Sequence, residues 1–147
     1  MFGGRALNLE TAERISQAQL LQQAGRVSEA RAIYEQIIAA DPQDARAIHY
    51  LGMSDSQSGE LELGLARVNR SIALNPQSPA FFSNRASLAS KWGKSRVAEL
   101  DYLRAISLKP EFIEGWHNFG CVLSGFVSPV DVFRSFEKCI RLDPTST

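Results

Sequence analysis

The chain has 147 residues, of which 44% are hydrophobic, and its sixteen basic and sixteen acidic residues leave no formal net charge. This length fits one domain, and this hydrophobic content is enough to fill a folded core. The balanced charge disfavours nucleic acid as a partner, and no apolar run comes near the roughly 18 residues that span a bilayer, so we expect no membrane insertion.

The first ten residues precede the periodic part of the chain, and we expect residues 1–10 to form an N-terminal extension. They begin Met1-Phe2-Gly3-Gly4-Arg5 and lack the hydrophobic stretch of a secretion signal. We therefore expect a cytoplasmic protein, with the reservation that a signal removed from the natural chain would leave the same residues.

Four prolines divide the rest of the chain into units of equal length. Pro42, Pro76, Pro110 and Pro144 stand 34 residues apart. A helix that runs into each proline must stop there, because proline lacks the amide hydrogen and shifts its predecessor out of helical geometry. A fixed period of this length indicates a repeat array.

Other residue types recur at the same interval and indicate what one unit contains. Counting from Thr11, Ala45, Pro79 and Ile113 as position 1, position 15 is glycine in three units, which suits the left-handed residue that ends a first helix. Small residues at positions 8 and 20, with a large one at position 24 and isoleucine at position 28, predict a second helix packed closely on the first. Each unit therefore reads as helix, turn, helix.

These units resemble tetratricopeptide repeats. The segments Gly25–Ala30 and Gly115–Gly120 carry the characteristic residues of that family in register. The resemblance implies an all-α fold, a right-handed α-solenoid of four helix-turn-helix repeats over residues 11–144. The expected repeats are 11–44, 45–78, 79–112 and 113–144, with 145–147 as a C-terminal tail.

The sequence motifs of enzymes and cofactor sites are incomplete or absent in this chain. The run Gly59–Gly64 has the glycine spacing of a phosphate-binding loop, but Leu65-Ala66 follows it instead of Lys-Ser. There is no Gly-x-Ser-x-Gly elbow and no His-Glu-x-x-His motif. We therefore expect no catalytic activity and no cofactor.

The two cysteines, Cys121 and Cys139, are expected to be free thiols, since two cysteines make no disulfide framework. His117 and Cys121 are four residues apart and share a helix face. His49 occupies the repeat position of His117 two units away, which is too distant for a third ligand. We expect no metal site.

The resemblance also implies that the first helix of each repeat lines a concave groove that binds a protein segment. Only Arg46, Lys91 and Glu114 would bring charge to this groove, and its many amides and hydroxyls suit an uncharged extended backbone. The candidate partner-binding residues are Gln19, Arg46, His49, Tyr50, Met53, Asn84, Ser87, Lys91, Glu114, His117, Asn118 and Cys121.

Two patterns within the family bear on the kind of partner. Tetratricopeptide domains that clamp the acidic tail of a chaperone use basic residues and asparagines at positions where this chain keeps only Asn84, so a carboxylate clamp is disfavoured. The groove is partly similar to that of O-linked N-acetylglucosamine transferases, in which an asparagine recurs at position 6, as Asn84 and Asn118 do here. Asparagine can pair with a peptide unit in both directions, or it can simply tolerate exposure at this position.

The expected last helix carries Phe133, Phe136 and Ile140, and Phe133 stands where other units have Arg31, Leu65 and Glu99. We therefore keep two alternatives to a free-standing adaptor. The chain could be the substrate-recruiting arm of a larger glycosyltransferase or sulfotransferase, or a homo-oligomeric scaffold joined through its terminal helices.

Overall fold

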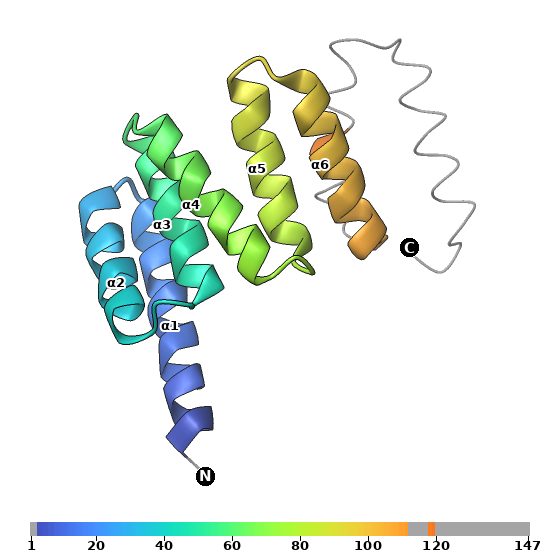
Figure 1. The fold of residues 1–147 in the computed structure, drawn as a ribbon. Coiled ribbons are helices and arrows are strands. Elements are labelled where there is room, and N and C mark those ends of the chain that lie inside the picture. The colour runs from blue at the N-terminus through green and yellow to red at the C-terminus, as the bar shows by residue number, and fades with distance from the viewer. Residues whose placement is uncertain (1–2, 112–117, 120–147) are drawn as a thin grey trace. The chain divides into compact units, whose positions relative to one another are not determined.

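The structure is a computed structural model that describes residues 3–111 and 118–119, with side chains described from residue 8 onward (Figure 1). Six helices form this part of the chain, and it contains no strand. They are α1 (Gly3–Gln23), α2 (Val27–Ala40), α3 (Ala45–Gln57), α4 (Leu61–Leu74), α5 (Pro79–Lys91) and α6 (Ser95–Leu108). The expected all-helical fold class is confirmed.

Two compact units divide the chain, Met1–Pro76 and Gln77–Thr147. The first unit contains two helix pairs, α1 with α2 and α3 with α4, and α3 also packs on α1 and α2. The second contains the pair α5 and α6. The fourth expected helix pair lies outside the described residues.

The turn inside each described pair depends on one glycine. Gly25, Gly59 and Gly93 have φ values of 80°, 91° and 71°, and no other residue of the described chain has a positive φ. In this left-handed region a side chain would clash with the backbone, so glycine is the residue that fits. The glycine predicted to end each first helix is confirmed.

Each second helix ends two residues before a periodic proline, as the sequence predicts. The last helical residues are Ala40, Leu74 and Leu108. The first helix of the following repeat then begins with residues that are typical of a helix N-terminus. Asp44 accepts a hydrogen bond from the Ala47 amide at 2.9 Å, and α5 has Pro79 at its first turn.

Small residues let the two helices of each pair approach closely. Ala18 and Ala30 in the first pair, and Ala86 and Ala98 in the third, are fully buried. In the second pair, α3 and α4 cross at Gly52 and Gly64, where a Cβ added to Gly52 would lie 2.7 Å from the Gly64 carbonyl oxygen. These are the small positions predicted from the repeat.

Larger side chains complete the core on either side of these crossings. In the first unit Ile15, Tyr34, Ile37 and Leu51 pack around Ala18 and Ala30. In the second, Tyr102, Ile106 and Phe119 pack around Ala86 and Ala98. The buried stripe predicted at positions 24 and 28 therefore supplies core residues in both units.

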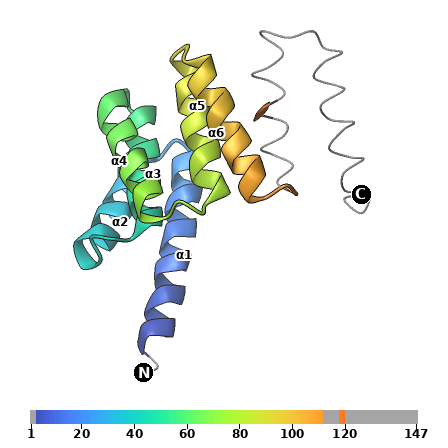
Figure 2. The same cartoon turned by 45° about the vertical axis from the view of Figure 1, so that its right-hand side comes forward.

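The N-terminal extension is part of a helix, which the repeat pattern did not predict. Helix α1 begins at Gly3, eight residues before Thr11, and both views show it reaching past the helices with which it packs (Figures 1 and 2). Leu9 is 64% exposed. The extension therefore lengthens α1 without adding to the core at that residue.

Candidate partner-binding site

The described candidate residues lie on the first helix of each pair and on the short described segment after α6. Arg46 and Lys91 are exposed, and the partly buried candidates are Gln19, Tyr50, Met53, Asn84, Ser87 and Asn118. Of the remaining candidates, Glu114, His117 and Cys121 lie outside the described residues. We use the name first-helix face for the described candidate residues that are exposed or partly buried. They lie on α1, α3 and α5, together with Asn118.

Tyr50 is anchored from the inner side of α3. Its ring stacks on that of Tyr34 in α2, with centroids 6.1 Å apart and planes 24° from parallel. Tyr34 is fully buried and donates its hydroxyl hydrogen to Gln22 Oε1 at 3.3 Å. Burial, and then the neighbouring Tyr50, raises the pKa of Tyr34 above its usual value. The stacking on Tyr34 therefore fixes the position of the Tyr50 side chain.

His49 does not belong to an exposed face, so its prediction as a surface contact is wrong. The side chain is fully buried, and its Nδ1 lies 3.0 Å from Ser71 Oγ in α4. Ser71 donates its own hydrogen to the Val68 carbonyl at 2.7 Å, so Nδ1 of His49 is the donor in the first contact. Burial lowers the pKa of His49 to about 3, which keeps the ring neutral near pH 7.

A bidentate ion pair to α6 helps to fix the rotation of α5. Arg85 donates from Nε and Nη2 to the two carboxylate oxygens of Asp101 in α6, each at 2.7 Å. The hydrogen bonds to Asp101 raise the pKa of Arg85. Because residues three and four apart share a helix face, this fixed rotation aligns the candidates Asn84, Ser87 and Lys91 along α5.

A buried carboxylate joins three helices of the first unit, and the sequence pattern did not predict it. Asp55 of α3 is fully buried and pairs with Arg67 of α4, and its Oδ1 lies 3.1 Å from Nη2 of Arg31 in α2. The Arg31 contact is an ion pair without hydrogen-bond geometry, so Oδ1 accepts no hydrogen bond. The sequence does contain a sign of this carboxylate, because the other repeats have the apolar residues Leu21, Ala89 and Leu123 at the position of Asp55.

The described part of the chain has neither a metal-binding cluster nor a membrane-spanning helix. No group of three or more His, Cys, Asp or Glu side chains there could hold a metal ion. Nor does any helix in that part have the length and apolar character needed to cross a membrane.

Paired helices, glycine turns and small-residue crossings at a fixed period define an α-solenoid repeat protein. Residues 21–88 match the family model of the tetratricopeptide repeat. Residues 21–88 therefore carry tetratricopeptide repeats, which confirms the resemblance over that segment, and the predicted fold class is confirmed.

Curated relatives are matched over only a small part of their own length. The chain is 30% identical over 77 residues to small glutamine-rich tetratricopeptide repeat-containing protein 2 of Mycosarcoma maydis, covering 52% of this chain and 22% of that protein. It is 24% identical over 95 residues to the Hsp70-Hsp90 organizing protein of Triticum aestivum, covering 65% and 16%. It is 27% identical over 116 residues to UDP-N-acetylglucosamine--peptide N-acetylglucosaminyltransferase of Giardia intestinalis, covering 79% and 8%.

Solved structures share the fold over most of this chain. MamA superposes with a TM-score of 0.71 at 20% identity, covering 89% of this chain and 77% of MamA. A mutant O-GlcNAc transferase of Thermobaculum terrenum gives 0.77 at 19% identity, covering 89% and 26%. The first tetratricopeptide domain of Spaghetti (RPAP3), bound to the HSP90 peptide SRMEEVD, gives 0.68 at 19% identity, covering 80% and 94%. The fold and these relatives support a protein-interaction module.

Proposed function

We propose that the chain is a non-catalytic adaptor that binds an extended segment of a partner protein along its first-helix face. The observation that carries this proposal is the chemistry of that face. Its accessible residues are mainly amides and hydroxyls, with Arg46 and Lys91 as its described charges. Amides and hydroxyls pair with the carbonyl and amide groups of a peptide backbone, whatever side chains the peptide carries.

Asn84 and Asn118 are the residues that we propose to hold the main chain of the partner. Both occupy position 6 of their repeats and both are partly accessible. Asn84 already has an interaction within the chain, so binding would exchange or share that contact. A side-chain amide offers an acceptor and two donors, which suits such sharing.

We propose that acidic C-terminal tails are not the ligand, although the RPAP3 domain is bound to the HSP90 peptide SRMEEVD and one relative is named Hsp70-Hsp90 organizing protein. The positions that would form a carboxylate clamp are occupied by Ile15, Gln19, Tyr50, Ala80 and Asn84. None of these side chains is basic, and Ile15 is only 4% exposed. A terminal carboxylate would therefore lose its hydration without gaining a charged donor.

The test compares the intact chain with the double variant Asn84→Ala, Asn118→Ala in capture from native lysate, read by mass spectrometry. We expect a protein captured by the intact chain to be lost by the double variant. Helicity and the thermal midpoint should stay close to those of the intact chain, because both asparagines are partly exposed. Asn69→Ala, the same change on an exposed site of α4, is the matched control and should keep the partner.

The purified partner then gives a direct affinity for both proteins. A decrease of about tenfold in the double variant, equal to ~1.4 kcal/mol, would agree with two lost backbone contacts. Equal affinity for the intact chain and the double variant would assign recognition to another surface and contradict the proposal. Tight binding of SRMEEVD to the intact chain would contradict the exclusion of acidic tails.

A second candidate function is the substrate-recruiting arm of a larger glycosyltransferase. The match to the Giardia transferase, which covers 79% of this chain, favours it. In that case the captured proteins should be sugar acceptors, and the natural reading frame should continue into a transferase domain. The self-association considered for Phe133, Phe136 and Ile140 concerns residues outside the described part of the chain and stays a prediction that light scattering can test.

A further inference from the structure

A pocket of about 470 Å³ opens on the first unit, formed by α2, α3, α4 and the turn after α2. It is separate from the first-helix face, since none of the candidate residues lines it. Its lining residues are Glu35, Ile38, Ala39, Pro42, Ile48, Leu51, Arg67 and Arg70. The volume falls within the range of about 300–1,000 Å³ that is usual for ligand sites.

The interior of this pocket is apolar and belongs to the core. Ile48 and Leu51 of α3 are 2% and 3% exposed, and Ile38 of α2 is partly buried and packs against that core. These side chains cannot move away without disturbing the unit, so the pocket has a rigid apolar floor. A floor of this kind favours an inserted aliphatic side chain.

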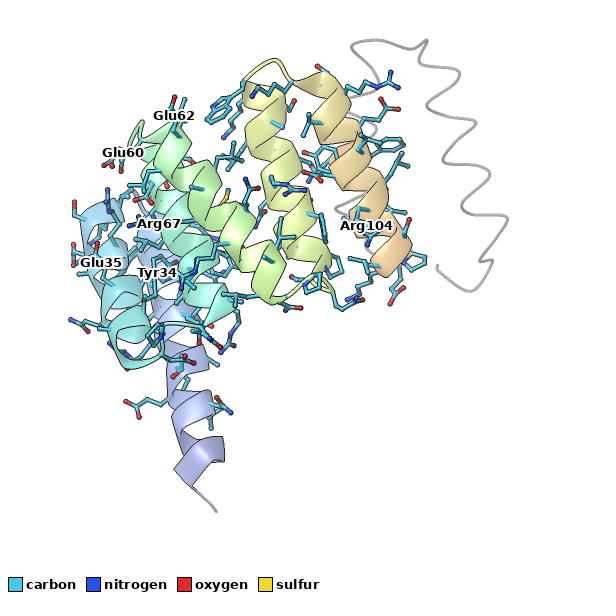
Figure 3. The ribbon with its side chains drawn as sticks, viewed as in Figure 1. Tyr34, Glu35, Glu60, Glu62, Arg67 and Arg104 are labelled. Carbon is cyan, nitrogen blue, oxygen red and sulfur yellow. The ribbon has the colours of Figure 1, made fainter. Side chains whose placement is uncertain are left out.

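Charged groups of opposite sign stand on the two walls of the pocket. Glu35 lies on α2, and Arg67 and Arg70 lie on α4 (Figure 3 labels Glu35 and Arg67). Arg67 is already paired with the buried Asp55. Arg70 is exposed, and it donates from Nη2 to the Pro42 carbonyl oxygen at 3.1 Å.

The bond to Pro42 holds the Arg70 guanidinium beside the pocket without neutralising it. A guanidinium has five N–H donors and this contact uses one of them. In the described part of the chain Arg70 forms no ion pair, and Glu35 forms neither an ion pair nor a side-chain hydrogen bond. The two walls therefore present a cation and an anion that have no ion-pair partner among the described residues.

We propose that this pocket is a second protein-binding site, which takes an aliphatic side chain of a partner segment flanked by one acidic and one basic residue. The aliphatic group contacts Ile48 and Leu51, the acidic residue pairs with Arg70, and the basic residue pairs with Glu35. A fatty acid or another simple carboxylate would satisfy Arg70 alone. The opposite charges on the two walls therefore favour a peptide segment that carries both signs.

The test uses defined peptides and methyl-labelled protein observed by nuclear magnetic resonance. The probe is the capped peptide Lys-Ala-Leu-Ala-Glu, and the matched peptides replace its leucine by alanine or its glutamate by lysine. We expect the probe to shift the methyl signals of Ile48 and Leu51 and to leave that of Met53 in place. Each matched peptide should bind about threefold more weakly or worse.

Two protein variants locate the effect. Arg70→Gln removes the cation of the α4 wall that is not paired with Asp55, and it should weaken probe binding about threefold. Ala39→Phe fills the pocket from an exposed position on α2 and should abolish the shifts, while Ala66→Phe at an exposed position of α4 that does not line the pocket should not. Core methyl signals that stay in place in the absence of peptide confirm that the variants fold.

The double variant Asn84→Ala, Asn118→Ala should bind the probe as the intact chain does, which separates this site from the first-helix face. Three results would overturn the proposal. They are the absence of pocket shifts at millimolar peptide, equal affinity for the intact chain and Arg70→Gln, and shifts at Met53 in place of those at Ile48 and Leu51.

Discussion

Two buried polar side chains, His49 and Asp55, are each matched by a partner on another helix. His49 donates to Ser71 of α4, and Asp55 pairs with Arg31 and Arg67 from α2 and α4. A buried polar group without such partners would cost about 1–3 kcal/mol or more. These contacts therefore specify which helices pack together as well as stabilising them.

At the residue scale, the neutral state of His49 predicts a pH dependence of stability. The folded-state pKa is about 3, well below the unfolded value of 6.5. The contribution of His49 to the free energy of unfolding is therefore complete above pH 6.5. It decreases as the pH falls from 6.5 toward 3, because in this range only the unfolded state takes up the proton. Between about pH 7.5 and about pH 5 this loss amounts to ~2 kcal/mol.

Urea unfolding of the intact chain and of His49→Asn at these two pH values measures this contribution. Asparagine keeps a donor for Ser71 but does not titrate. The intact chain should lose about 2 kcal/mol more stability than the variant on acidification, and His117 is present in both proteins, so its effect cancels. Equal losses in the two proteins would show that His49 takes up its proton in the folded state.

The burial of His49 and Asp55 was not predicted from the sequence. The repeat register predicts the average environment of a position, and it assigned His49 to the surface. Its burial follows from Ser71, which stands where other repeats have Ile37, Ala105 and Cys139. A change on a neighbouring helix thus alters the environment of a residue, and the register alone does not contain that information.

At the scale of elements, the crossing of α3 and α4 depends on the absence of two side chains. A Cβ on Gly64 would lie 2.5 Å from the Gly52 carbonyl oxygen, and it would also overlap Ser56 Oγ. The two helices cannot move apart easily, because the fully buried Val68 packs at this crossing, with its Cγ2 3.1 Å from the position of a Cβ on Gly52. The close approach therefore requires glycine at this position of α4.

Gly64→Ala should consequently destabilise the chain although alanine is the better helix former. The gain in helix propensity is about 1 kcal/mol, whereas overpacking of a tight contact costs about 1–3 kcal/mol. Since the closest backbone atom cannot rotate away, we expect a net loss of about 1–2 kcal/mol in urea unfolding. Ser56→Ala in the same background should recover part of it. A Gly64→Ala protein more stable than the intact chain would show that the crossing is looser than described.

Helix ends were the elements best predicted from the sequence, because proline and glycine act through their own backbones. Proline at 42, 76 and 110 ends α2, α4 and α6, and glycine at 25, 59 and 93 ends the first helices. The start of α1 at Gly3 was missed. A periodic pattern arises from residues that contact other repeats. It therefore does not predict the part of a helix that extends past its neighbours.

At the scale of the whole molecule, the described first and second helices offer different exposed surfaces. The first-helix face carries amides, hydroxyls and a few charges. The second helices carry separate apolar side chains, of which Leu100 on α6 is 62% exposed, and Val97 and Leu103 are also exposed. The described candidates of the first-helix face other than His49 are exposed or partly buried, and their role in binding stays a prediction. The sequence did not predict the α2–α4 pocket, whose walls come from helices about 30 residues apart.

Site-specific photo-crosslinking can show whether the partner segment lies along the first helices. A benzophenone amino acid is placed at Ser87 on α5 in one protein and at Leu100 on α6 in another, and each is irradiated in native lysate. We predict that the Ser87 protein crosslinks to the partner captured by the intact chain and that the Leu100 protein does not. Crosslinking of that partner from Leu100 alone would contradict binding along the first helices and assign recognition to the second helices.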